Sequence, residues 1–167
     1  MSEPARDERA EAISAAMASL ARRALSRAEL DAKLRARGFS EDIVAAVLSR
    51  LEELKLIDDR ALAERVARRR VESGRAGRFR VRTELRRRGV PDEILEDAVA
   101  SSVPPERERA SASTELERFL RSRARRRETR DETRDETRKR LRAAAFRHLI
   151  ARGFPAELVR DLLGVSL

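Results

Sequence analysis

Side chains that commonly perform catalysis are scarce in this chain. Its 167 residues include no cysteine and a single histidine, His148, which excludes thiol nucleophiles, disulfides and Cys/His zinc sites. Paired carboxylates such as Glu52/Glu53 and Asp58/Asp59 could support acid–base chemistry, but such pairs are expected when 41% of the residues are charged. We therefore interpret Asp58 and Asp59 as a helix cap and His148 as a surface histidine.

Sequence motifs of common enzymes are also missing. The chain has no G-x-x-x-x-G-K-[ST] phosphate-binding loop, no G-x-G-x-x-G, no G-x-S-x-G and no H-E-x-x-H. We predict a protein without catalytic activity that binds no metal and no cofactor.

The charge of the chain is more informative. Lysine and arginine number 39 against 30 acidic residues, which gives a net charge of +9. Residues 65–88 hold eleven arginines and only two carboxylates, so this segment alone carries a charge equal to that of the whole chain. Arginine concentrated along successive helices is typical of a surface that binds nucleic acid or another polyanion. The candidate site residues are Arg65, Arg68, Arg69, Arg70, Arg75, Arg78, Arg80, Arg82, Arg86, Arg87 and Arg88.

A simpler explanation of this basic segment stays open, namely a solubilising surface in an arginine-rich chain. Gly74 and Gly77 could let backbone amides approach a phosphate, but an ordinary turn between helices also explains them. Phe79 is the only aromatic residue of the segment, and we assign it to the core. Stacking of nucleic-acid bases is therefore not expected.

An apolar pattern that occurs three times predicts helical repeats. It pairs a core leucine with a glycine four residues later: Leu34 with Gly38, Leu85 with Gly89, and Leu149 with Gly153. Apolar residues recur at i, i+3, i+4 and i+7, as on one face of a helix, with no two-residue alternation. Glycine after the last apolar position suits a left-handed helix cap. The predicted fold class is all-α, built of tandem three-helix, helix-turn-helix-like modules.

Composition and the repeat together divide the chain. We expect a polar tail at 1–9, three-helix repeats at 10–57 and 58–100, a linker with consecutive prolines at 101–106, and a third repeat at 107–167. Three tetrads at 128–139, two Glu-Thr-Arg-Asp and one Glu-Thr-Arg-Lys, are interpreted as a charged low-complexity extension of the third repeat. No apolar run approaches the roughly 18 residues of a membrane span, so we expect a soluble, cytoplasmic protein. No apolar face is obviously left over for self-association, and we expect a monomer.

Each repeat also contains a more specific set of residues. The middle set is Ile57, Asp58, Asp59, Arg60, Ala63, Arg68, Arg70, Gly74, Gly77, Glu84, Leu85, Arg88, Gly89 and Val90. The first is Leu25 to Leu30 with Lys33, Leu34 and Gly38, and the third is His148, Leu149, Arg152, Gly153 and Phe154. Together they resemble the RecX family of bacterial regulators of the RecA recombinase. The chain departs from that pattern at Leu62, where the family prefers a bulkier aromatic residue.

The resemblance implies both an architecture and an activity. The implied fold is an elongated, curved array of three-helix modules. The implied partners are the RecA nucleoprotein filament and DNA, single-stranded or double-stranded. By similarity the protein would bind along the groove of the RecA filament on single-stranded DNA and damp ATP turnover and strand exchange, without catalysis of its own.

Two other classes of function stay open at this point. A helix-turn-helix-like DNA-binding protein would read a duplex through the corners at Gly38, Gly89 or Gly153. Against it, acidic residues open the helices that follow these corners, which is unfavourable beside phosphates. A helical adaptor for protein interactions would have no affinity for DNA.

Overall fold

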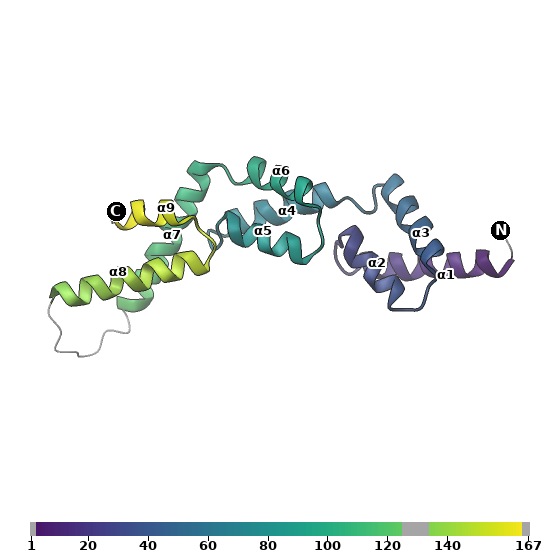
Figure 1. Cartoon of the computed structure of the whole chain (residues 1–167), viewed down its shortest axis with the longest axis horizontal. Coiled ribbons are helices and arrows are strands. Elements are labelled where there is room, and N and C mark those ends of the chain that lie inside the picture. Colours follow the sequence, from purple (N-terminus) through teal and green to yellow (C-terminus); the bar gives the residue numbers. More distant parts are fainter. Residues whose placement is uncertain (1–2, 125–133, 165–167) are drawn as a thin grey trace. The chain divides into compact units, whose positions relative to one another are not determined.

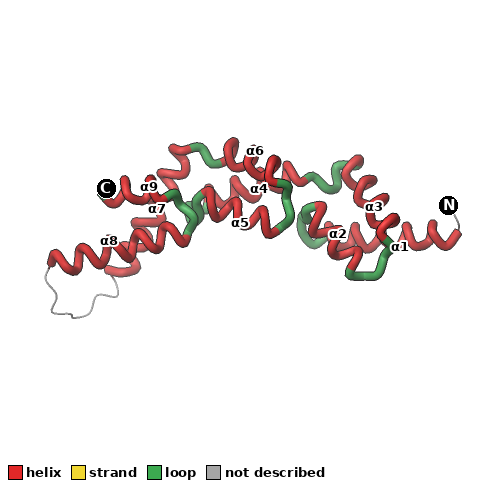
Figure 2. The backbone as a smooth tube through the Cα atoms, in the orientation of Figure 1, coloured by secondary structure: helices red, strands yellow, loops and turns green. Residues whose placement is uncertain are grey.

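The computed structural model describes residues 3–124 and 134–164 as α-helices joined by loops and turns (Figure 1). Within these residues there is no strand (Figure 2). The helices are α1 (Glu3–Leu20), α2 (Arg27–Arg35), α3 (Glu41–Glu53), α4 (Asp59–Glu72), α5 (Arg78–Arg87), α6 (Asp92–Ser102), α7 (Pro105–Ala124), α8 (Arg134–Ala151) and α9 (Ala156–Leu163). We refer to α1–α3, α4–α6 and α7–α9 as modules 1, 2 and 3. The predicted all-α fold of tandem three-helix modules is confirmed.

Each module turns a corner at a left-handed glycine after its second helix. The φ angles are +88° at Gly38, +71° at Gly89 and +83° at Gly153, a conformation that favours a residue without a Cβ. The helix after each corner opens with carboxylates, such as Glu41 and Asp42 in α3, which interact favourably with the helix dipole. The corners predicted from the repeat are therefore present.

Two helix ends differ from the expected boundaries. α1 begins at Glu3, so the polar residues 3–9 belong to a helix. α6 ends at Ser102 and α7 begins at Pro105, so the connection is shorter than the predicted linker. Proline is well tolerated as the first residue of a helix because its missing N–H would have no partner there. Apolar periodicity shows which residues of a helix are buried. It does not show where a helix ends when the residues at that end are polar. Residues 128–133 of the tetrads lie outside the described residues.

The chain forms two compact units. The first contains the residues up to Arg65 together with Leu85–Ala98, and the second contains Val66–Glu84 and the residues from Val99 on. Module 2 therefore contributes residues to both units. No described helix is both long enough and apolar enough to cross a membrane.

Each unit has an apolar core. In the first unit α1 packs against α2 and α3, around a core that includes Leu30, Leu34, Val44, Val47 and Leu48. In the second unit α7, α8 and α9 pack together, around a core that includes Ala112, Leu149, Phe154 and Val159. The side chains predicted as core from the repeat, Leu34, Leu85 and Leu149, are at most 1% exposed.

Candidate nucleic-acid interface

The structure separates the eleven candidate arginines into two groups, and six of them make contacts within the fold. Four pair with carboxylates: Arg70 with Glu84, Arg78 with Glu108, Arg86 with Asp92 and Arg88 with Glu29. Arg80 donates a hydrogen bond to the Ala151 carbonyl at 3.3 Å. The Arg82 guanidinium lies 5.6 Å from the centre of the Phe79 ring. These six side chains are already engaged by the protein itself.

The other five candidates are Arg65, Arg68, Arg69, Arg75 and Arg87, and all are exposed. No residue in the described part of the chain forms an ion pair or a hydrogen bond with their side chains. Arg68 and Arg69 near the end of α4 and Arg75 in the turn that follows belong to the second compact unit, whereas Arg65 and Arg87 belong to the first. The structure thus leaves three available cations within a short stretch of one unit, which we call the α4 cluster (Arg68, Arg69 and Arg75).

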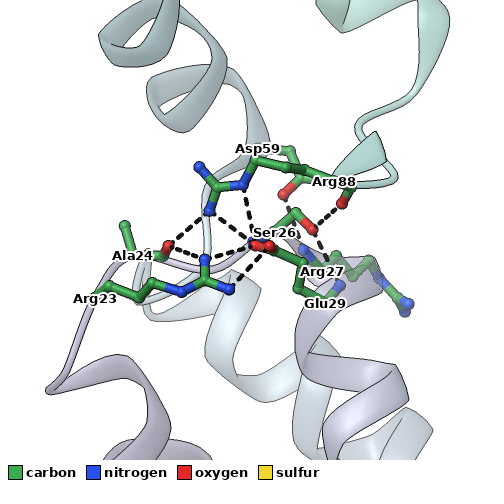
Figure 3. Close-up of polar contacts among 7 residues, drawn as sticks. All are labelled: Arg23, Ala24, Ser26, Arg27, Glu29, Asp59 and Arg88. Carbon is green, nitrogen blue, oxygen red and sulfur yellow. Dashed lines mark hydrogen bonds and ion pairs between the residues drawn. The ribbon is translucent and has the colours of Figure 1, made fainter. Parts of the chain in front are cut away.

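One joint between modules lies within the first unit, where the start of α2 meets Arg88, the residue before the Gly89 corner (Figure 3). Ser26 caps α2 and its hydroxyl donates to the Arg88 carbonyl. The Arg88 guanidinium donates to the Glu29 carboxylate and to the Ala24 carbonyl, both at 2.7 Å. A Cβ on Gly89 would lie 2.5 Å from the Ala28 Cβ. Arg88 is therefore a structural residue of this joint.

The pKa values of two carboxyl groups in this joint, Glu29 and Asp59, shift in opposite directions. Burial opposes ionisation of Glu29, but hydrogen bonds from Arg23, Arg88 and the Ser26 amide outweigh it and lower its pKa to about 2. Burial raises the pKa of Asp59, and the hydrogen bond that its carboxylate accepts from the Arg27 amide offsets this only in part. Glu29 is therefore a firmly ionised anchor for two arginines.

A second joint of the same design lies within the second unit, where the start of α5 meets the Gly153 corner. The amides of Gly77 and Phe79 donate to the carbonyls of Arg152 and Gly153 at 3.0 and 3.1 Å. A Cβ on Gly77 would lie 2.4 Å from the Gly153 carbonyl oxygen. Gly77 thus serves the close approach of two backbones. Its amide is already bonded, which favours the interhelix-turn interpretation over a phosphate cradle.

Each of the two joints contains a carboxylate that caps a helix of the preceding module. In the first joint, Asp59 at the start of α4 accepts a hydrogen bond from the Arg27 amide at 2.9 Å. In the second, Glu108 in α7 accepts one from the Arg78 amide at 2.7 Å and pairs with the Arg78 guanidinium at 2.6 Å. Arg27 and Arg78 occupy the same position of the repeat, 51 residues apart. Their acidic partners Asp59 and Glu108 are 49 residues apart, so this offset does not relate them and could not have found the second cap.

The predicted cap at Asp58 and Asp59 is therefore divided between two helices. Asp58 accepts a hydrogen bond from the Ala61 amide at 2.9 Å and caps α4, as predicted. Asp59 instead caps α2 through Arg27. The sequence could not show this, because the partner lies 32 residues away.

Two sequence-based assignments of single side chains are wrong. His148 is only partly exposed: its Nε2 lies 2.8 Å from the buried Glu115 carboxylate, and its ring stacks on Phe119 with centroids 4.7 Å apart. The equivalent positions in the other repeats, Lys33 and Glu84, misled the prediction because the partners of His148 come from α7. Phe79 is not core but 51% exposed.

Comparison with known proteins places this architecture in a family. Residues 12–51 match the family model described as "RecX, first three-helix domain", and residues 58–99 match "RecX, second three-helix domain". Two solved structures share the fold. The crystal structure of RecX from Lactobacillus salivarius has a TM-score of 0.77 at 21% identity and covers 95% of both chains. The crystal structure of another regulatory protein RecX has a TM-score of 0.80 at 22% identity and covers 96% of this chain and 75% of its own.

Curated relatives are closer in sequence. The regulatory protein RecX of Mycobacterium sp. (strain JLS) is 38% identical over 99% of this chain and 86% of its own length. That of Prosthecochloris aestuarii is 33% identical over 91% of both chains. With two domain models matched in order and relatives aligned along nearly the whole chain, this chain belongs to the RecX family of regulatory proteins.

Proposed function

We propose that this chain is a non-catalytic, monomeric cytoplasmic regulator that binds the RecA filament on single-stranded DNA and inhibits its ATPase and recombinase activities. Its membership of a family of regulatory proteins supports a regulatory role. The observation that carries the DNA contact is the α4 cluster, whose three guanidinium groups are exposed and unpaired among the described residues. Phosphates of the DNA, free or within the filament, would provide the missing anions.

The α4 cluster suits phosphate better than base-edge recognition. Guanidinium groups neutralise phosphates and release bound counterions, which gives affinity without sequence preference. The first turns of α3 and α6, which a helix-turn-helix protein would present to a duplex, carry Glu41, Asp42, Asp92 and Glu93. Their charge would be repelled by the phosphate backbone. We therefore rank duplex reading through the corners below filament binding.

The test compares two triple variants of equal charge. Arg68→Ala/Arg69→Ala/Arg75→Ala removes the α4 cluster, and Arg22→Ala/Arg37→Ala/Arg107→Ala removes three exposed arginines elsewhere. Salt titrations of single-stranded DNA binding should show the slope of log affinity against log salt flatten by about 2 for the first triple, at about 0.7 per phosphate contact. RecA ATPase inhibition should weaken in parallel, and the second triple should change both much less.

The alternatives predict different results. If only the total positive charge matters, both triples will weaken binding equally, which contradicts a localised interface. An adaptor without DNA affinity would show no binding to oligonucleotides even at low salt. Capture of RecA from a lysate only when single-stranded DNA and a non-hydrolysable ATP analogue are present would support filament binding over both alternatives.

A further inference from the structure

Phe79 is an exposed aromatic side chain that packing does not explain. It is the second residue of α5, and 51% of it is accessible, more than of any other aromatic residue described. Its backbone is held in the second joint, where its amide donates to the Gly153 carbonyl. The equivalent position of the first joint is Ala28, which lies against the Gly89 corner. A methyl group is enough at this position of the first joint, so a joint of this design does not require the benzyl side chain of Phe79.

The surroundings of Phe79 are cationic. Residues 75–82 contain four arginines and no carboxylate. Arg82 holds its guanidinium 5.6 Å from the centre of the Phe79 ring, within the range of a cation–π contact. Arg75 of the α4 cluster lies four residues before Phe79 and is exposed. One exposed ring with a guanidinium group beside it is a poor site for an apolar ligand, because it offers too small an apolar area next to a charge.

A nucleotide of an unpaired strand matches this combination. The base offers a flat π face to the ring, and a neighbouring phosphate offers an anion to the exposed Arg75. In a duplex both faces of each base are already covered by neighbouring bases, so the same ring has nothing to stack on. From these contacts we infer that Phe79 is a stacking platform for an unpaired base and gives this chain a preference for single-stranded over double-stranded nucleic acid. This inference rests on the proposed DNA contact of the α4 cluster. It adds recognition of the base, which the arginines do not contact.

The chain offers an unusually clean probe of stacking. It contains no tryptophan and no tyrosine, so Phe79→Trp introduces a single fluorophore at the platform. Titration with a thymidine oligonucleotide of about 15 nucleotides should quench its emission as an unpaired base stacks on the indole. The matched control is Phe119→Trp, whose ring replaces one stacked on His148 inside the second unit. Its emission should not change when the same oligonucleotide binds, as followed by the anisotropy of a labelled oligonucleotide.

A second measurement separates stacking from charge. Phe79→Ala should weaken binding of the oligonucleotide by roughly tenfold, while Phe79→Tyr should retain the affinity of the unaltered chain. The slope of log affinity against log salt should be the same in all three, because no phosphate contact is lost. Binding to a duplex of the same length should be unaffected by Phe79→Ala. Since the side chain is exposed, the helical circular dichroism of each variant should match that of the unaltered chain.

Several outcomes would overturn the inference. Unchanged Phe79→Trp emission at saturating oligonucleotide, or equal losses of single-stranded and duplex binding in Phe79→Ala, would exclude base stacking. Loss of RecA inhibition by Phe79→Ala with unchanged oligonucleotide affinity would assign the ring to a protein contact instead. If the unaltered chain binds no oligonucleotide, the proposed DNA contact fails together with the platform. If it binds and only the α4 cluster variant is impaired, the proposed function stands and the platform alone fails.

Discussion

The backbone amide of Arg78 donates a 2.7 Å hydrogen bond to the carboxylate of Glu108, a side chain from the next module that is 1% exposed. The same carboxylate pairs with the Arg78 guanidinium. One buried acid therefore satisfies the start of α5 and the charge of an arginine at once. Removing it would leave both donors without that partner in a joint between modules.

Glu108→Ala should lower the free energy of unfolding by about 2–4 kcal/mol, less than a fully buried pair would lose because the Arg78 side chain is 32% exposed and can reach solvent. Glu108→Gln, which still accepts one hydrogen bond, should lose about half as much. Urea unfolding followed by circular dichroism measures both. The control Asp161→Ala breaks the exposed pair with Arg109 and should change the free energy by less than about 1 kcal/mol. Equal effects of Glu108→Ala and Asp161→Ala would contradict a structural role of Glu108.

The pKa of Glu29, about 2 in the folded chain against an ordinary value of 4.5, makes its contribution to stability dependent on pH. A carboxyl whose folded pKa is depressed stabilises the fold above its unfolded pKa, and this contribution is lost as the pH falls through the folded pKa. Glu29→Gln should therefore cost about 1–2 kcal/mol at pH 7. The difference from the unaltered chain should shrink between about pH 4.5 and pH 2.

Urea unfolding at both ends of that pH range measures this difference. Glu53→Gln, which removes an exposed partner of Arg50, is the control, and its small effect should not vary in this way. A Glu29→Gln penalty that is the same at pH 7 and at pH 2.5 would show that the side chain acts through its shape and not through its charge.

Lys55 is the one non-glycine residue with positive φ among those described, at 57°. It follows α3, and its amide donates to the Glu52 carbonyl, as in a left-handed helix cap. A side chain in this conformation costs about 1 kcal/mol that glycine avoids. Lys55→Gly should therefore raise the free energy of unfolding by about 0.5–1 kcal/mol, once the greater freedom of glycine in the unfolded chain is counted. A decrease in stability would mean that the lysine side chain makes a stabilising contact.

Substitutions at two corner glycines, Gly38 and Gly89, distinguish the energetic cost of the backbone conformation from the cost of close packing. Gly38 and Gly89 both have positive φ, but a Cβ on Gly38 would meet nothing within 4 Å, whereas on Gly89 it would lie 2.5 Å from the Ala28 Cβ. Gly38→Ala should cost about 1 kcal/mol, from the backbone alone. Gly89→Ala should cost at least about 1 kcal/mol more, because the joint must open to admit the methyl group. Thermal unfolding of both variants tests this order, and the double variant Gly89→Ala/Ala28→Gly should recover part of the larger loss.

Local and repeated features of this protein could be predicted from its sequence. The three leucine–glycine pairs indicated the helical modules, the buried positions Leu34, Leu85 and Leu149, and the corners, because each depends on residues within one or two helical turns of one another. The cap at Asp58 belongs to the same class, since its partner is three residues away. The family resemblance could also be recognised from the sequence, because it rests on the order of such local motifs.

Only the tertiary structure decided which polar side chains already have a partner within the fold. It separates the eleven arginines into six that are engaged and five that are available, since partners such as Glu108 lie 30 residues from the arginine that they bind. It turns Asp59 toward the module before it, buries one side of His148 against α7 and leaves Phe79 exposed. Apolar periodicity records which face of a helix is buried. It does not record which distant helix supplies the neighbour, because that depends on how the modules pack.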